Sequence, residues 1–485
     1  MGKSPVTRAR AYVSACHQYE LRLNGAVVDR GPAFAYPGEG YYQATDIAPF
    51  VKAGARLAIG VIYHWYGPGQ GRPAGERGLL VRIVIEHGDG SREVLLSDGA
   101  WRVRRAPQWQ PGAPQRNNDG GDYVERIDAR AVPDGWDYPG YDASGAEWAV
   151  PEILGVHPVD PFTHLTGQEP RLRYSEVAPL GVRTLADGTL VADFGRVLPA
   201  RPRLRFAAGR AGRTLAIQTG YRLTAEGRID TSPDATQRTD MSFGFTQRDG
   251  RQEMLAFTHL AFRYLQVSAP GEALAPGAIA AIVEHTDAPD GHGAVFESSD
   301  PTLDAVFELV QRSALHSVQQ QFVDTPTREK GQFLQDAIDQ SYATMRGAME
   351  RDATQKAIRE FVQSQARYWP DGRVNAVYPN GDGKRDIPDF TEMLPNWVWR
   401  YYMETGDRTL PPEVRARPTL VEDRGLVDVH HPEPRLPRPV RPVDVLVALP
   451  EVLVEDAHLL ERGATHHAAV ADHPVDVLRR LLDAA

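Results

Sequence analysis

The stretch "VDTPTREKGQFLQD", residues 323–336, brings acidic and basic side chains close together in the sequence. Asp324, Glu329 and Asp336 supply three carboxyl groups, and Arg328 supplies a guanidinium. A glutamate kept among other carboxylates has its pKa raised, as a general acid working near neutral pH requires. Clustered carboxylates without Cys or His ligands suit two chemistries. One is glycoside hydrolysis, in which a carboxyl protonates the leaving oxygen, and the other is binding of a hard cation such as Ca²⁺.

Two observations bear on the choice between these chemistries and a purely structural role. A calcium loop of the Asp-x-Asp-x-Asp-Gly kind is absent from the stretch, and "NGDGKRD" at 380–386 resembles such a loop only weakly. An ion-paired helix start would also explain the charges, with Pro326 and Thr327 as turn residues and Glu329 near the positive end of the helix dipole. The carboxylate cluster alone therefore leaves the choice open.

The chain before this stretch is rich in strand and turn signals. "YELRLNGAVV" alternates around an Asn-Gly pair at 24–25, the strongest short signal for a β-hairpin. Two more alternating strands flank Gly-Asp-Gly at 88–90. Further strands between about 170 and 290 predict a second β-domain, in which the polar segment at 231–250 is expected to be a long surface loop. We therefore expect two consecutive β-sandwiches.

At about residue 298 the hydrophobic period changes to that of a helix. "SSDPTLDAVFELVQRSALHSV" offers Ser299 or Asp300 as the N-cap and Pro301 in the first turn. The apolar residues that follow at helical spacing are Leu303, Val306, Phe307, Val310 and Ala314. Further helices are expected at about 333–349, 352–368 and 391–404, the last stopped by the glycine of "METGD". The charged stretch thus lies in the connection between the first two helices, where functional residues are common.

The run "DTPTREKGQFLQD" resembles the signature of the bacterial α-L-rhamnosidases of glycoside hydrolase family 78, approximately Asp-Cys-Pro-Gln-Arg-Glu-Lys-x-Gly-Trp-x-Gly-Asp. The residues that match at identical spacing are Asp324, Pro326, Arg328, Glu329, Lys330 and Asp336. The β-regions also resemble that family. "YELRLNGAVV" is similar to its N-terminal sandwich, and "VADFGRVLPARPRLRF" and "FTHLAFRYLQV" are similar to the concanavalin-like sandwich that precedes its catalytic (α/α)6 barrel.

The resemblance implies inverting hydrolysis of terminal α-L-rhamnosides, with Glu329 in the position of the general acid. Asp324, Arg328 and Asp336 match positions whose side chains hold the rhamnose hydroxyls. Phe333 replaces the signature's tryptophan and keeps an apolar wall for the methyl group of the sugar. The general base of the family is a glutamate far along the barrel, beyond the matching sequence, so no residue is assigned to that role. We therefore expect this chain to hydrolyse little or nothing.

Two tryptophans beyond the stretch are further candidates for the sugar site. Trp369 and Trp397 lie in or beside the 369–390 loop and the next helix, where an aromatic ring could stack on a pyranose. Core packing is the more common explanation for such residues. No cofactor and no metal site is expected, because the histidines carry no metal spacing and Cys16 is the single cysteine.

The overall composition narrows the class of partner. The chain has 485 residues, a net charge of −10 and 42% hydrophobic residues, which is normal for a soluble globular protein of about three domains. The negative charge opposes nucleic-acid binding and fits a neutral small-molecule substrate, here one that contains rhamnose. The N-terminus lacks the apolar segment of a signal peptide, and no 18-residue apolar run exists. A cytoplasmic protein without membrane contact is expected, and its oligomeric state stays open.

The last part of the chain has a different composition. From Pro411 to Ala485 only Pro, Glu, Val, Arg, Ala, Thr, Leu, Asp, Gly and His occur. Apart from Thr419 and Thr465, every residue type present has a codon that begins with G or C. We interpret this tail as out-of-frame translation of a GC-rich gene, and the alternative is a genuine Pro/Val/Arg-rich tail.

The expected organisation is therefore multidomain, with β-domains followed by helices. It comprises a jelly-roll-like N-terminal sandwich (1–165), a concanavalin-like sandwich (166–292), the first part of an (α/α)6 catalytic domain (293–410) and the anomalous tail (411–485). Two alternative functions remain. One is a non-catalytic or degenerate carbohydrate-binding protein, and the other is an (α/α)6 glycosidase that acts on a different sugar.

Overall fold

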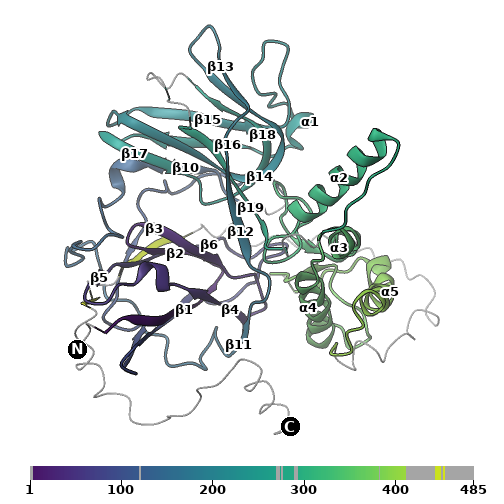
Figure 1. Ribbon diagram of the computed structural model, residues 1–485, viewed down its shortest axis with the longest axis horizontal. Helices are drawn as coiled ribbons and strands as arrows, with labels where there is room; N and C mark the ends of the chain where they lie inside the picture. Colours follow the sequence, from purple (N-terminus) through teal and green to yellow (C-terminus); the bar gives the residue numbers. More distant parts are fainter. Residues whose placement is uncertain are drawn as a thin grey trace.

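The computed structural model describes residues 4–118, 122–268, 274, 277–288, 293–381 and 383–410, and the backbone of 443–448 and 452–453. Figure 1 shows two sheet-rich parts, one above the other, with the helices beside them. Among the helices of this part of the chain, none has both the length and the hydropathy that a membrane crossing requires. The tail interpreted as out of frame lies outside the described residues, except for the backbone of β22 (Val443–Ala448) and β23 (Val452–Leu453).

The first β-domain consists of two facing sheets. One sheet contains, in spatial order, β11 (His164–Gly167), β4 (Glu39–Asp46), β1 (Val6–Cys16), β7 (Gly78–His87) and β8 (Arg92–Leu96). The other contains β3 (Ala26–Gly31), β2 (Gln18–Leu23), β6 (Ile59–Trp65), β22 and β9 (Arg102–Arg105), while β5 (Arg56–Leu57) pairs with β23. Alternate side chains of β1, β2, β6 and β7 form one apolar core between the sheets, as a period of two predicts.

Both hairpins predicted in this domain are confirmed. Asn24 and Gly25 join β2 to β3 with φ of 49° and 83°, the left-handed pair that a type I′ turn requires. The turn between β7 and β8 contains Gly90 with φ of 83°, and Asp89 Oδ1 accepts the N–H of Ser91 at 2.9 Å. The local turn chemistry was therefore sufficient to place these strand pairs.

The second β-domain is a nine-stranded sheet, in the upper part of Figure 1. Its path runs through β10 (Glu125–Asp128), β16 (Ser242–Thr246), β15 (Thr214–Gly220), β18 (Leu260–Val267), β14 (Leu190–Gly209), β19 (Ile279–Thr286) and β12 (Leu172–Val177), and β13 (Gly181–Thr184) and β17 (Gly250–Leu255) also pair with β14. The long β14 links these strands because it pairs with β18 along its first half and with β17 and β19 along its second. β10 comes from the stretch assigned to the first domain, so one strand crosses the predicted division.

The prediction of a long surface loop at 231–250 is wrong. This segment contains the short helix α1 (Pro233–Thr236), capped by Ser232, and strand β16. It buries Met241, Phe243 and Phe245 in the core of the second β-domain. Its apolar residues alternate over only a few positions between polar ones, so the period was too short to indicate a strand.

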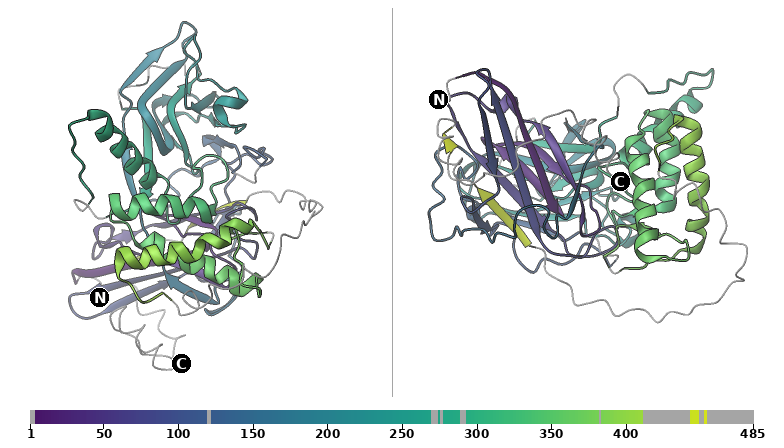
Figure 2. Two further views of the ribbon diagram at one scale, coloured as in Figure 1. Left: turned by 90° about the vertical axis from the view of Figure 1, so that its right-hand side faces the viewer. Right: turned by 90° about the horizontal axis from the view of Figure 1, so that it is seen from below.

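Within the described residues, four long helices follow the β-domains: α2 (Pro301–His316), α3 (Leu334–Gly347), α4 (Asp352–Tyr368) and α5 (Pro388–Thr405). They confirm the four predicted helices to within a few residues. Asp300 is the N-cap of α2, because its Oδ1 accepts the N–H of Thr302 at 2.8 Å, and Gly406 ends α5 with φ of 67°. Figure 2 shows α3, α4 and α5, in green, side by side, and they share one apolar core.

Helix α2 leaves most of its apolar stripe exposed. Leu303, Val306 and Val310 are 52%, 50% and 51% exposed, and Ala314 near the C-terminal end is buried. In Figure 1 the helix extends away from the other three. The helical spacing predicted for α2 is therefore confirmed, while the part of the chain that the structure describes covers only its last turns.

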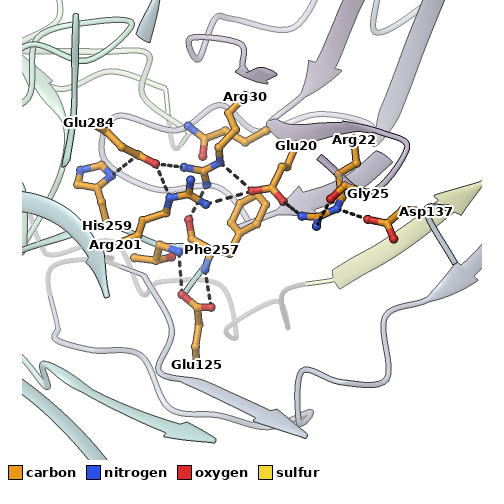
Figure 3. A network of polar contacts seen from close by, with 12 residues as sticks. Glu20, Arg22, Gly25, Arg30, Glu125, Asp137, Arg201, Phe257, His259 and Glu284 are labelled. Atoms are coloured by element: carbon orange, nitrogen blue, oxygen red, sulfur yellow. Dashed lines mark hydrogen bonds and ion pairs between the residues drawn. The ribbon is translucent and has the colours of Figure 1, made fainter. Parts of the chain in front are cut away.

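A buried ion-pair network, which we call the junction network, joins the two β-domains (Figure 3). Arg30 of β3 donates to Glu284 of β19 at 2.6 Å and to the carbonyl of Phe257 at 2.5 Å. Arg201 of β14 donates to Glu20 of β2 at 3.1 Å and also pairs with Glu284. These four charged residues are at most 6% exposed. Since each carboxylate meets guanidiniums from both β-domains, the network holds the domains in one arrangement.

Candidate active site

The charged stretch forms a closed loop between α2 and α3, residues 323–331, which we call the signature loop. The N–H of Asp324 donates to the carbonyl of Gly331 at 2.9 Å, and the N–H of Gly331 donates to Asp324 Oδ1 at 2.8 Å. After Lys330, with φ of 59°, the chain enters β20 (Gln332–Phe333), which pairs with β21 (Val377–Tyr378). The two ends of the signature loop are therefore fixed to each other and to the helical core.

The signature loop also contacts both β-domains. Lys330 Nζ donates to the carboxylate of Asp122 and, at 2.6 Å, to the carbonyl of His259. Thr327 Oγ1 accepts the N–H of Ala261, in β18, at 2.9 Å. Because these contacts lie on either side of Arg328 and Glu329, the β-domains set the position of the charged tip.

Asp324, Arg328 and Glu329 come together at this tip. The Thr325 hydroxyl lies 3.0 Å from Glu329 Oε2 and 3.3 Å from Asp324 Oδ2, so it bridges the two carboxyls. Arg328 Nη1 lies 2.6 Å from Glu329 Oε1. Glu329 is 9% exposed and lies five residues ahead of α3, so it does not cap a helix in bulk solvent. The structure therefore does not support the alternative of an ion-paired helix start.

Two aspartates of the charged stretch, Asp324 and Asp336, have raised pKa values. Burial raises the pKa of Asp324 to about 8, and the hydrogen bond and negative charge of Glu329 add to the rise. Burial also raises the pKa of Asp336, with smaller contributions from the charges of Asp339 and Glu329. Asp324 therefore keeps its proton near neutral pH, because ionising it would place a second negative charge in a buried site beside Glu329. A buried carboxyl that stays protonated next to Glu329 and Arg328 gives the site a proton of the kind that general acid catalysis needs.

Asp336 and Phe333 border the cluster from the start of α3. Asp336 lies half-buried in the first turn of the helix. Phe333 precedes the helix and is partly exposed, and a Cβ placed on Gly331 would lie 2.9 Å from the Phe333 ring. The absence of a side chain at Gly331 therefore leaves room for this ring beside the signature loop.

The structure does not bring the two candidate tryptophans into the cluster. Trp397 is fully buried in the helical core, where its Nε1–H donates to Ser341 Oγ at 2.8 Å. Trp369 is 4% exposed and donates to Asn375 Oδ1 at 2.7 Å. Neither ring is open to a sugar in this structure, because Trp397 packs in the helical core and the Trp369 ring lies against Arg373 and Lys384.

Sequence reasoning did not assign a role to Thr325 or to the partner of Lys330. A hydroxyl residue between two acidic positions was the available signal for Thr325. Asp122 is separated from Lys330 by 208 residues, so no local pattern could have indicated that pair. Within the described residues, no group of three or more His, Cys, Asp and Glu side chains is placed to hold a metal ion.

Three family models match the chain in the order of its domains. The α-L-rhamnosidase N-terminal domain matches residues 4–170, and the bacterial α-L-rhamnosidase concanavalin-like domain matches 183–285. The bacterial α-L-rhamnosidase six-hairpin glycosidase domain matches 291–412, which includes the signature loop. Three α-L-rhamnosidase domain models thus match successive parts of the chain.

The chain belongs to the bacterial α-L-rhamnosidase family. It is 28% identical over 427 residues to an α-L-rhamnosidase of Streptomyces avermitilis, an alignment that covers 83% of this chain and 39% of that relative. The solved structure of Streptomyces avermitilis α-L-rhamnosidase complexed with L-rhamnose has a TM-score of 0.67 at 24% identity, over 85% of this chain and 40% of that one. The family 78 rhamnosidase of Bacillus sp. GL1 has a TM-score of 0.70 at 16% identity, over 84% and 64%. The chain thus spans about two-fifths of the length of the curated relative that it matches.

Proposed function

We propose that the chain carries the proton-donating side of an α-L-rhamnosidase active site, which removes terminal α-L-rhamnose from rhamnosides with inversion. We also propose that α2 to α5 form the first part of an (α/α)6 barrel, with domain boundaries near 165, 292 and 410. The ends of the matched models, at 170, 285 and 412, support these boundaries. The observation that carries the function is the Asp324–Glu329 carboxyl pair, which Thr325 bridges inside a loop fixed to both β-domains.

Each residue of the cluster has a role in this proposal. Glu329 is the general acid, and the proton that it donates goes to the oxygen of the scissile bond. Asp324, Arg328 and Asp336 hold the rhamnose hydroxyls, because carboxylates and guanidiniums form directional hydrogen bonds with such groups. Phe333 provides the apolar wall for the methyl group of the sugar.

The second reactant is water. In an inverting reaction a base on the opposite face of the sugar takes a proton from water as the oxygen attacks the anomeric carbon and the bond to the leaving oxygen breaks. Acid and base carboxyls in such enzymes lie roughly 6.5–9.5 Å apart. We assign the base to none of the described residues. The chain is therefore expected to bind L-rhamnose and to hydrolyse rhamnosides slowly or not at all.

Binding of free L-rhamnose tests the site without requiring turnover. Isothermal titration calorimetry should show saturable binding that Asp336→Asn weakens about tenfold or more, the effect of losing one charged hydrogen bond. Asp339→Asn is the matched control, because Asp339 lies on the exposed side of the same helix. Equal affinities of the unaltered chain, Asp336→Asn and Asp339→Asn would contradict the proposed sugar site.

Azide tests the acid separately from the base, because it can attack the anomeric carbon without giving up a proton. With p-nitrophenyl α-L-rhamnoside and azide, we expect release of p-nitrophenol and formation of the β-configured rhamnosyl azide. Glu329→Gln should reduce this rate strongly for an alkyl rhamnoside and weakly for the p-nitrophenyl one, whose leaving group needs little protonation.

Rapid hydrolysis without azide that disappears in Glu329→Gln would show that this chain does contain a base. Rhamnose binding with no reaction under either condition would instead identify a carbohydrate-binding protein.

A further inference from the structure

An open cleft of about 1060 Å³ lies beside the signature loop. Its walls come from the 114–118 segment, from α1 and the residues that follow it, and from Arg328 of the signature loop. The described lining residues are Pro114, Gln115, Arg116, Asn117, Asn118, Pro233, Asp234, Gln237, Arg238 and Arg328. We call this space the amide–arginine cleft. None of the roles proposed above involves this cleft.

The parts of the amide–arginine cleft are fixed to one another and to the signature loop. Asn117 Nδ2 donates to the carbonyl of Arg328 at 3.2 Å and to Thr239 Oγ1 at 3.4 Å. Arg116 Nη1 donates to the carbonyls of Asp240 and Ser242, at 2.8 Å each. The cleft is therefore held together by hydrogen bonds across three distant segments of the chain.

The side chains of Gln237 and Arg238 stand exposed at the wall of the cleft. Both residues have left-handed backbones, with φ of 51° and 58°, which non-glycine residues adopt at a cost of about 1 kcal/mol or more each. The backbone is held there because the N–H of Arg238 donates to the carbonyl of Pro233 at 2.9 Å. Strained backbone is concentrated at functional sites, so two consecutive residues in this conformation make Gln237 and Arg238 candidates for a functional role.

The chemistry of the lining selects a kind of ligand. Its described members are amides, guanidiniums, one carboxylate and two prolines, and none is aromatic or a large aliphatic residue. Amide and guanidinium groups match the closely spaced hydroxyls of a sugar, whereas a flat aromatic group would find no ring on which to stack. The cleft therefore favours a hydroxylated sugar ring over an aromatic ligand.

The position of the cleft indicates which part of the substrate it would bind. A general acid must lie within hydrogen-bond distance of the leaving oxygen, so the leaving group binds beside Glu329. Arg328 lies 2.6 Å from Glu329 and also lines the cleft. We propose that the amide–arginine cleft is the leaving-group subsite and that it takes a second sugar ring, with Gln237 and Arg238 as its specificity-determining residues. The proposal rests on the function inferred above.

Three probes test this subsite by affinity: L-rhamnose, the disaccharide α-L-rhamnosyl-(1→6)-D-glucose and p-nitrophenyl α-L-rhamnoside. All measurements use the full chain with Glu329→Gln, so that no probe is consumed. We expect the disaccharide to bind about tenfold more tightly than L-rhamnose and the aryl rhamnoside to show no such gain. In the Gln237→Ala/Arg238→Ala double variant the ratio of the two sugar affinities should fall to about one. Arg251→Ala, an exposed arginine of β17 outside the cleft lining, should keep the ratio of the parent.

The outcomes separate the two proposals. L-rhamnose binding with equal affinity for the disaccharide, or a tenfold gain that survives in the double variant, would overturn the leaving-group subsite and leave the rhamnose site intact. A larger gain for the aryl rhamnoside than for the disaccharide would also overturn it, because the cleft would then favour an aromatic group. Absence of binding for all three probes would instead count against the rhamnosidase function itself.

Discussion

Buried carboxylates in the junction network and in the signature loop have opposite pKa shifts. Burial alone would raise the pKa of Glu20 and of Glu284, but neighbouring guanidiniums lower both below their usual value. Arg22, Arg201 and Arg30 act on Glu20, and Arg30 and Arg201 act on Glu284. In the signature loop burial raises the pKa of Asp324, and its carboxyl neighbour Glu329 raises it further. The same functional group is removed from water in both places. Cationic partners keep it ionised in the junction network, whereas in the signature loop burial keeps Asp324 protonated and the carboxyl neighbour adds to the effect.

This difference separates the parts of the chain that hold the structure from the part that can transfer a proton. A carboxylate between two arginines stays ionised, and its ion pairs hold the surrounding elements in place. A carboxyl against another carboxyl keeps a proton near neutral pH and can release it to a substrate. Lys330 connects the two kinds of site, because it belongs to the signature loop and pairs with Asp122, a buried aspartate whose pKa is lowered, despite burial, by Lys330 and Arg72.

The largest effect is expected from breaking the junction network. Arg201→Met removes the guanidinium shared by Glu20 and Glu284, so two carboxylates stay buried with fewer partners. The free energy of unfolding should fall by about 3–5 kcal/mol, measured by urea unfolding and circular dichroism. Arg205→Met is the control, because Arg205 lies on the same strand in an exposed pair with Glu253 and should cost about 1 kcal/mol or less. Equal losses for the two variants would contradict the view that burial gives the network its strength.

A smaller loss is expected where the two kinds of site meet. Lys330→Met leaves Asp122 with Arg72 as its cation and removes the hydrogen bond to the His259 carbonyl. We expect a loss of about 2–3 kcal/mol in stability and weaker binding of L-rhamnose, because the signature loop loses one of its contacts with the β-domains. Calorimetry with Lys52→Met, an exposed lysine, gives the baseline. Reduced stability with unchanged rhamnose affinity would show that this contact does not position the site.

The parts of this architecture that could be predicted are those set by neighbours in the sequence. The Asn24–Gly25 turn and the Asp300 cap act within a few residues, so both appear where the pattern indicated. Asp324, Arg328 and Glu329 lie within six positions, and a single closed loop is enough to bring them together. The local pattern was therefore sufficient for the centre of the candidate site.

The features that were missed depend on distant segments or on side-chain direction. Trp397 belongs to a helix that was predicted, but nothing in its spacing showed that its ring points into the core instead of toward the loop. The segment at 231–250 forms a strand because it has β15 and β10 as neighbours, and those contacts join residues far apart in the chain. The amide–arginine cleft depends on the same long-range packing, and for this reason its residues carried no recognisable motif.

The smallest change in stability is expected at Asp324, and its sign is opposite to that of the first two predictions. The folded pKa of about 8 lies above the ordinary value of 3.8, so between these values the folded chain holds a proton that the unfolded chain releases. The stability from this group is complete below about pH 4 and is lost as the pH rises toward 8. Asp324→Asn removes the titration and keeps an N–H donor for Glu329. It should therefore be more stable than the parent by about 1–2 kcal/mol at pH 9 and should show no gain at pH 4.

Glu350 provides the comparison with a buried carboxyl outside the signature loop. Burial, with a smaller contribution from the charge of Asp352, raises its pKa to about 7, and its carboxylate accepts the N–H of Ala353 at 2.7 Å. Glu350→Gln should flatten the fall of stability with pH much as Asp324→Asn does, since both remove a buried carboxyl of raised pKa. Only Asp324→Asn should also weaken L-rhamnose binding, measured by calorimetry at pH 6. If both variants weakened it equally, the upward pKa shift of Asp324 would report burial alone, and the contrast between paired and shared carboxyls would lose its connection to function.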